Sequence, residues 1–463
     1  MKGKKPVLTV FSLTMITIGS VDSLRNLPAT ALFGSQLIVF FIFGALFFLL
    51  PTALVSAELS SAWPKQGGVY IWVKEAFGKR VGFLAIWLQW IENVIWYPTI
   101  LSFVAGTVGY LINPSLAENA YFLWGVIVAS FWGATILNLR GMQMSALFSS
   151  VCAISGLLLP MTLIILLGLV WVVAGNTAHI HLTWDSIMPH WGDQSMWVSL
   201  TAIMLSLCGI EIATVHANDV EDPQHAFPRS LAYSVVIILA TLILGSLTIA
   251  TVLPQNEINL VAGIMQAFDA FFARYHLTGL MPVIAVMLVL GGLGGVNNWI
   301  IAPTKGLLVA AEDDNLPTSF RKVNQYGAPS WMLIGQAVIV TIISSLFLFM
   351  PSVNGSYWAL TALAAQLYMF MYFLLLLAGL KLRISEPDKH RPFHIPGGLM
   401  GVVTVVLVGL FGVVMTFIVS FIPPEGIDVG STWHYEVLLL ASFLIMCLPP
   451  FVATWMASIK KNV

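Results

Sequence analysis

Long apolar runs dominate this chain, and they lack the strict alternation of a membrane β-strand. About 20 helical residues cross ~30 Å of hydrocarbon, and lipid offers the backbone no hydrogen-bond partners, so such runs predict membrane-spanning helices. We expect a shorter helix at 259–274 to lie outside the spans. Twelve spans are predicted, at 8–33, 37–57, 81–112, 122–139, 144–174, 198–215, 228–253, 281–311, 331–350, 357–382, 399–421 and 437–456.

Composition agrees with an all-α membrane protein. Hydrophobic residues make up 58% of the chain and charged residues 9%, whereas a soluble domain has roughly 25% charged residues. The polar interruptions are too short for a soluble domain, so the chain is expected to fold as one polytopic unit. A net charge of −1 argues against a nucleic-acid partner.

Neither a disulfide frame nor a zinc site is suggested by the three cysteines, Cys152, Cys208 and Cys447, because all lie in apolar spans. We expect no cofactor and no metal. With the N-terminus in the cytoplasm, nearly all loop lysines and arginines fall on the cytoplasmic side and only Arg274 falls outside. The sequence therefore predicts an integral protein of the bacterial inner (plasma) membrane with both termini in the cytoplasm.

The first and sixth spans share an interruption in which glycine is followed by an acid. A helix broken inside the membrane frees N–H groups that attract a carboxylate and C=O groups that suit an ammonium. Paired breaks predict a binding site for a small dipolar solute such as an amino acid; the alternative is that the glycines only permit close helix packing. The residues concerned are Gly19, Ser20, Val21 and Asp22 in the first span and Cys208, Gly209, Ile210 and Glu211 in the sixth.

Charged residues at membrane depth cost about 2.5–3.5 kcal/mol each on insertion scales and are expected to face a cavity and to pair. There are five: Asp22, Arg25, Glu92, Glu211 and Lys305. Asp22 and Arg25 would be neighbours on a helix and so could form a structural ion pair. Alternatively, Arg25 binds a substrate carboxylate, while Asp22 accepts hydrogen bonds from an amine or from the frayed backbone. The two arrangements could also alternate.

Proton coupling is suggested by an imbalance of charge. Three acids face two bases, so one carboxylate lacks a fixed cationic partner and is a candidate proton carrier. Glu211 is the first candidate and Glu92 the second. The alternative for Glu92 is a polar contact with Gln89 or Asn93. Lys305 is expected to take part in coupling or gating.

Aromatic residues supply candidate gating and binding surfaces. Tyr368 and Tyr372, in "YMFMY", share one helix face and each presents a hydroxyl and a flat ring. Trp299 follows two asparagines in the eighth span. Packing is the alternative for each, so they count as site candidates only together with the broken helices.

Several stretches resemble one transporter family. "AELSSAWPKQGGVYIWVKEAFG" at 57–78 is similar to the second-span exit and loop of the amino acid–polyamine–organocation (APC) superfamily. "NEINLVAGIMQAF", "NNWIIAPTKGLLVAAEDDNLP", "YMFMY", "RPFHIPGG" and "FIVSFIPPEGID" resemble the bacterial glutamate/GABA antiporters.

The resemblance implies a LeuT-like bundle of twelve helices with an inverted five-plus-five repeat and unwound helices 1 and 6. The repeats would be 8–174 and 198–382, followed by two further helices in 399–456. It also places Glu211, Trp299, Tyr368 and Tyr372 along the transport path, and a basic residue at Lys305. Asp22 and Arg25 depart from the antiporter pattern, which has uncharged residues there. Because the chain ends at Val463, gating by a C-terminal plug is expected to be absent.

The sequence thus predicts a secondary active amino acid transporter, an antiporter that exchanges a glutamate-like amino acid for another amino acid or its decarboxylation product. The substrate carboxylate would dock at Gly19 to Asp22 and its ammonium at Cys208 to Glu211, with Arg25 reading a second carboxylate. A cationic amino acid or polyamine transporter and a non-transporting membrane sensor are the alternatives. No nucleophile-and-base set suggests an enzyme. The expected partners are the lipid bilayer and a small amino acid or amine, in a monomer or homodimer.

Overall fold

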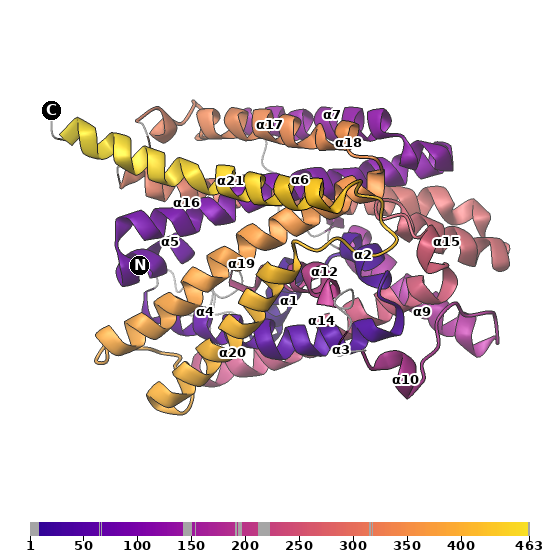
Figure 1. Cartoon of the computed structure of the whole chain (residues 1–463), viewed down its shortest axis with the longest axis horizontal. Coiled ribbons are helices and arrows are strands. Elements are labelled where there is room, and N and C mark those ends of the chain that lie inside the picture. The colour runs from indigo at the N-terminus through magenta and orange to yellow at the C-terminus, as the bar shows by residue number, and fades with distance from the viewer. Residues whose placement is uncertain are drawn as a thin grey trace, which may run out of the picture.

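The computed structural model describes residues 9–63, 65, 67–141, 151–152, 154–189, 192, 197–211, 223–313, 316 and 318–461. Within these ranges the chain forms helices and no strand (Figure 1). The α-helices are α1 (Val10–Val21), α2 (Leu27–Ala31), α3 (Leu37–Gly44), α4 (Leu50–Ala62), α5 (Val69–Phe77), α6 (Lys79–Ile112), α7 (Ala120–Leu139), α9 (Leu159–Val173), α10 (Trp184–Ile187), α12 (Ser199–Ser206), α14 (Pro223–Val252), α15 (Gly263–Arg274), α16 (Met281–Glu312), α17 (Ser330–Ser344), α18 (Leu346–Phe349), α19 (Val353–Ser385), α20 (Gly398–Val419) and α21 (Thr432–Lys461).

Ten helices among the described residues are long and apolar enough to cross a membrane. They match ten of the predicted spans; of the other two, the first is interrupted after Val21, and the sixth is interrupted after Ser206 and is described only as far as Glu211. The predicted short helix at 259–274 is present as α15. Parts of two predicted spans, 144–150 and 212–215, lie outside the described residues, and the count of twelve stays a prediction.

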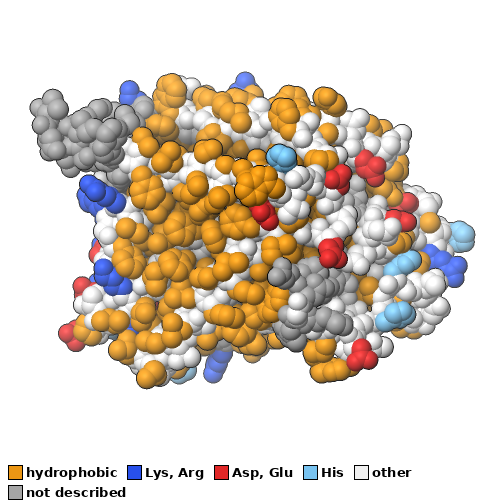
Figure 2. Space-filling model, viewed as in Figure 1, with side chains coloured by type: hydrophobic (Ala, Val, Ile, Leu, Met, Phe, Trp, Pro, Cys, Tyr) orange, Lys and Arg blue, Asp and Glu red, His pale blue; other side chains and the backbone are white. Residues whose placement is uncertain are grey.

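Two long helices form the centre of the bundle. In its most apolar stretch, α6 has 72% of its residues buried, and α19 has 78%. The same stretch of α7 and of α21 has only 22% of its residues buried. The outer helices therefore turn apolar side chains outward. Figure 2 shows hydrophobic side chains over the middle of the visible face and charged groups and histidines mostly toward its two ends. An apolar belt between polar ends suits a bilayer, where lipid takes the place of a protein partner.

The first break lies directly after α1. The helix continues through Gly19, Ser20 and Val21, so the break begins later than the sequence predicted. Asp22 and Ser23 adopt extended backbone conformations, and the chain then resumes in a 3₁₀ turn that leads into α2.

The second break follows α12 and touches the first. Leu207, Cys208 and Gly209 leave the α-helical pattern, which resumes at Ile210. Gly209 has a φ of +106°, which side chains rarely tolerate, and a Cβ there would lie 2.6 Å from the Ser20 carbonyl oxygen. Glycine is therefore required at this position both by the backbone conformation and by the close approach of the two breaks.

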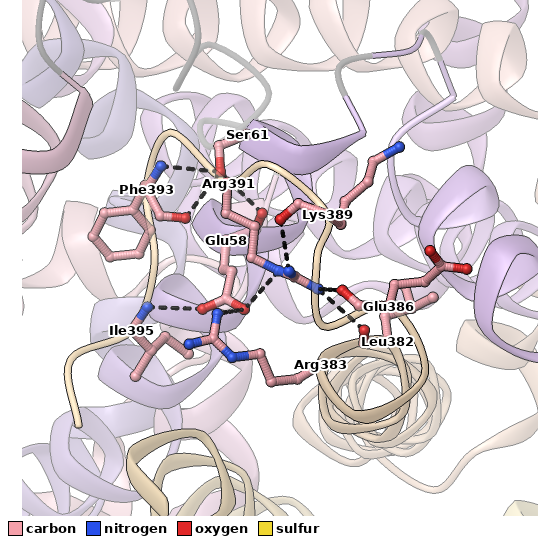
Figure 3. A network of polar contacts seen from close by, with 9 residues as sticks. All are labelled: Glu58, Ser61, Leu382, Arg383, Glu386, Lys389, Arg391, Phe393 and Ile395. Carbon is pink, nitrogen blue, oxygen red and sulfur yellow. Dashed lines mark hydrogen bonds and ion pairs between the residues drawn. The ribbon is translucent and has the colours of Figure 1, made fainter. Parts of the chain in front are cut away.

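A buried polar network holds the end of α19 to that of α4 (Figure 3). Glu58 of α4 accepts hydrogen bonds from Arg383 Nη1 at 3.0 Å and from the Ile395 backbone N–H at 2.7 Å. Arg391 Nε lies 3.2 Å from the same carboxylate. Because α19 also carries Tyr368 and Tyr372, this network anchors the helix that supports the second break.

A second polar contact joins α5 to the end of α16. Asp313 accepts hydrogen bonds from the Lys74 ammonium and the Tyr70 hydroxyl. Burial acts to raise the pKa of Asp313, but these two hydrogen bonds and the Lys74 charge outweigh it and hold the pKa below its usual range.

Candidate functional site

A cavity of about 200 Å³ lies where the two helix breaks meet. At about 30 Å³ per liquid water, this is room for roughly six or seven waters, or for a small organic solute. Ten of the predicted site residues line the cavity: Gly19, Ser20, Val21, Asp22, Arg25, Glu92, Cys208, Gly209, Trp299 and Tyr368.

Asp22 enters the cavity wall from the first break. Its Oδ2 accepts a 2.8 Å hydrogen bond from the Thr241 hydroxyl of α14. Its Oδ1 is buried and has no partner among the described groups. One oxygen of this carboxyl group is therefore held by the protein, and the other is a buried acceptor without a hydrogen-bond donor among the described groups.

Arg25 is held by groups of α6 and α19. Its Nη1 donates to the Thr99 hydroxyl, its guanidinium lies 5.3 Å from the centre of the Trp96 ring, and its carbonyl accepts a 3.1 Å bond from Tyr357. Its Nε has no partner within the described chain.

The structural ion pair between Asp22 and Arg25, one of the two predicted arrangements, is absent from this part of the described structure. That pairing assumed a continuous helix, in which residues three apart are neighbours. The extended backbone at Asp22 and Ser23 separates the two side chains, so each finds a partner on another helix.

Glu211 lies behind the cavity wall, in a network with α6 and α19. Gln89 Nε2 donates to it at 2.9 Å and Tyr368 at 2.8 Å, and Tyr372 donates to its second oxygen. The Tyr372 hydroxyl also accepts a 3.0 Å bond from the Gly209 backbone N–H. The network therefore ties the second break to α19.

Of the four remaining predicted site residues, three do not line the cavity and the fourth, Lys305, is not described there. Ile210, Glu211 and Tyr372 are buried beside it. Lys305 belongs to α16, but its side chain lies outside the described set. Glu92 lines the cavity and also accepts a 3.3 Å hydrogen bond from Asn93. This is the polar contact that was the alternative to a role of Glu92 in proton coupling.

The aromatic part of the wall comes from α6 and α16. The rings of Trp96 and Trp299 lie 6.0 Å apart, and the Trp299 carbonyl accepts a 2.8 Å bond from Tyr97. Next to them the glycines of "GGLGG" line the cavity, and Gly291 also packs against Gly156, where an added Cβ would lie 2.1 Å from the Gly291 Cα. Close helix packing and an open cavity wall thus depend on the same glycines.

Two features of the site were missed from the sequence. Gln89, Asn93 and Trp96 share a face with Glu92, at the spacing i, i+3, i+4, i+7 within an apolar span. Asn93 and Trp96 line the cavity and Gln89 bonds Glu211 behind it, so this pattern could have identified α6 as a wall of the site. Thr241 left no such signal, because a lone threonine in an apolar helix usually bonds to its own backbone.

These apolar spans around a polar cavity define an integral membrane protein, and comparison gives its family. Residues 8–443 match the amino acid permease family, and the chain belongs to it. The resemblance inferred from the motifs is thereby confirmed.

Several transporters are similar over nearly the whole chain. An uncharacterized transporter of Legionella pneumophila is 42% identical over 98% of this chain and 97% of its own length. A glutamate/gamma-aminobutyrate antiporter of Lactococcus lactis is 27% identical over 96% of this chain and 90% of its own. A probable agmatine/putrescine antiporter of that species is 23% identical, covering 86% of this chain and 84% of its own.

Proposed function

We propose that this permease is a secondary active antiporter that exchanges a glutamate-like amino acid for another amino acid or for its decarboxylation product. The observation that carries the proposal is the cavity between two touching helix breaks, with a carboxylate and a guanidinium in its wall. Broken helices expose main-chain dipoles of both signs at membrane depth, which suits a solute that carries both charges.

In this proposal the chain adopts the LeuT-like arrangement, with twelve spans, repeats at 8–174 and 198–382, and both termini in the cytoplasm of a bacterial inner membrane. Exchange proceeds by alternating access, with no enzymatic step. Glu211 is the proposed proton-coupling group, because its contacts reach the second break through Tyr372 and the cavity wall through Tyr368. Glu92 and Lys305 are further candidates for coupling or gating.

Glutamate is favoured because Arg25 lines the cavity, its Nε has no hydrogen-bond partner among the described groups, and a guanidinium suits a second carboxylate. The glutamate/gamma-aminobutyrate antiporters among the similar proteins support the same choice. A second candidate is a cationic amino acid or polyamine: Asp22 and Glu92 outnumber Arg25 in the cavity wall, and polyamine transporters are also among the relatives.

Counterflow in proteoliposomes tests these assignments. Vesicles are loaded with glutamate, GABA, arginine or putrescine, and uptake of labelled glutamate or labelled putrescine is measured in each. Preloading with the true counter-substrate accelerates uptake, whereas an unrelated solute does not. Acceleration of glutamate uptake by glutamate or GABA supports the first candidate, and acceleration of putrescine uptake by arginine or putrescine supports the second. Uptake that no internal solute changes would exclude exchange.

A further inference from the structure

The strongest unused acceptor in the cavity wall is Asp22 Oδ1. The Asp22 side chain lines the cavity, and the residue is only 7% exposed. Thr241 occupies Oδ2, so the orientation of the carboxyl group is set by α14 while Oδ1 lacks a donor within the described chain. A buried acceptor without a donor is costly, so a ligand N–H that fills the position binds favourably.

The carbonyl end of α1 strengthens this position. The Asp22 backbone N–H donates a hydrogen bond to the Ile18 carbonyl, and the Ser20 hydroxyl donates one to the Thr17 carbonyl. The carbonyls of Gly19 and Ser20, beyond them, receive no hydrogen bond from any described group. Since the C-terminus of a helix carries partial negative charge, the carbonyls and the carboxylate together favour a cation.

The carbonyls in the last turn of α12 are bonded in the same way as those of α1. The Leu205 carbonyl accepts from the Cys208 backbone N–H, the Met204 carbonyl from the Cys208 thiol, and the Ile203 carbonyl from the Ser206 hydroxyl. The carbonyls of Ser206 and Leu207, like those of Gly19 and Ser20, receive no hydrogen bond from any described group, so the Asp22 carboxylate is the feature that favours an ammonium at the first break.

We infer that Asp22 binds the protonated amino group of the transported solute, with Arg25 facing a carboxylate of the solute, which is the second carboxylate in the case of glutamate. The inference rests on the proposed function only in taking this cavity as the substrate site. It names the residues that select, within the proposed amino acid substrates, solutes with both an ammonium and a carboxylate. Glutamate and GABA are such solutes. A polyamine is not, because one of its ammonium groups would meet the guanidinium, and neither is an N-acetyl amino acid, which carries no positive charge for Asp22.

Ligand binding to the purified full-length protein tests the inference without requiring transport. The probes are glutamate, GABA, arginine and putrescine, with N-acetylglutamate as the amine-blocked counterpart, in sodium-free buffer. Dissociation constants come from the rise in melting temperature with ligand concentration. In the wild-type protein, glutamate or GABA is expected to bind and N-acetylglutamate is not.

Three variants separate recognition from structure. Asp22→Asn keeps the shape of the side chain and is expected to weaken binding of the amino acid about 10-fold or more, because it removes the charge from the hydrogen bond. Thr241→Val frees the carboxyl group and is expected to weaken binding about 3-fold. Thr30→Val is the matched control: it removes a 2.6 Å hydrogen bond between Thr30 and Ser246, which also joins the first span to α14 but lies off the cavity. Its affinity should equal that of the wild type.

Several results would overturn the inference. These are wild-type affinity in Asp22→Asn, equal binding of N-acetylglutamate and glutamate, or no binding of any amine probe. If Asp22→Asn does not fold, unchanged affinity in Thr241→Val has the same meaning. Failure of exchange with intact, Asp22-dependent binding would refute the antiporter proposal alone.

Discussion

Glu58 provides the sharpest test of what holds the bundle together. The residue is 5% exposed, and its carboxylate faces two arginines and one backbone N–H in the network of Figure 3. Glu58→Gln preserves the size of the side chain and one carbonyl acceptor but removes the negative charge. The guanidinium groups of Arg383 and Arg391 then lose this counter-ion, on side chains that are only 17% and 5% exposed.

The expected cost follows from this burial. Removing one partner of a buried ion pair costs about 3–5 kcal/mol, and the acceptor that glutamine retains places Glu58→Gln near the lower end, at about 3 kcal/mol. Glu75→Gln is the matched control. Glu75 lies 3.6 Å from Lys65 with side chains 38% and 66% exposed, and exposed pairs contribute about 0–1 kcal/mol.

Thermal unfolding of the purified variants in one detergent, followed by tryptophan fluorescence, makes the comparison. Glu58→Gln should lower the melting temperature by several times the shift of Glu75→Gln. A double variant with Arg383→Gln should lose less than the sum of the single losses, because the two groups interact directly. Equal melting temperatures for Glu58→Gln and Glu75→Gln would show that burial does not set the strength of this network.

Three further predictions concern other parts of the molecule. Gly156→Ala should destabilise the fold by about 1–3 kcal/mol or more, measured by thermal unfolding, because the new Cβ would overlap the Gly291 backbone. Tyr372→Phe should slow exchange in proteoliposomes, because it removes the hydroxyl that donates a hydrogen bond to Glu211 and accepts one from the Gly209 backbone N–H. Asp313→Asn should lower the melting temperature between pH 8 and pH 5, and the difference should vanish at strongly acidic pH. The low pKa of Asp313 means that its stabilising charge is fully present above the usual value of 3.8 and is lost as the pH falls through the folded value.

Each of these has a control and a contrary result. Gly133→Ala, with no atom within 4 Å of the added Cβ, should be neutral or slightly stabilising, and an equal loss in both glycine variants would contradict the packing argument. Tyr121→Phe, at a side chain that is 78% exposed, should leave exchange unchanged; equal rates for the two tyrosine variants would remove the network from the mechanism. For Asp313→Asn, the melting temperatures of variant and wild type should still differ at pH 5. If that difference has already disappeared at pH 5, the ion pair with Lys74 does not lower the pKa of Asp313.

Much of the candidate site could be predicted from composition and spacing. Asp22, Arg25 and Glu92 stood out because a charge at membrane depth needs a compensating environment, and all three line the cavity. The network around Glu211 could not be predicted, because Gln89 and Tyr372 come from helices that are distant in the sequence.

The sequence by itself determined the membrane class, the placement of ten spans, the two interrupted segments and the family. These are consequences of local composition, which lipid constrains strongly. The tertiary structure alone decided which partner each polar group takes: Thr241 rather than Arg25 for Asp22, and Thr99 and Trp96 for Arg25. Hydrogen bonds reach only about 3 Å, so the choice depends on which helices pack side by side and on an extended backbone at Asp22 that no residue spacing reveals.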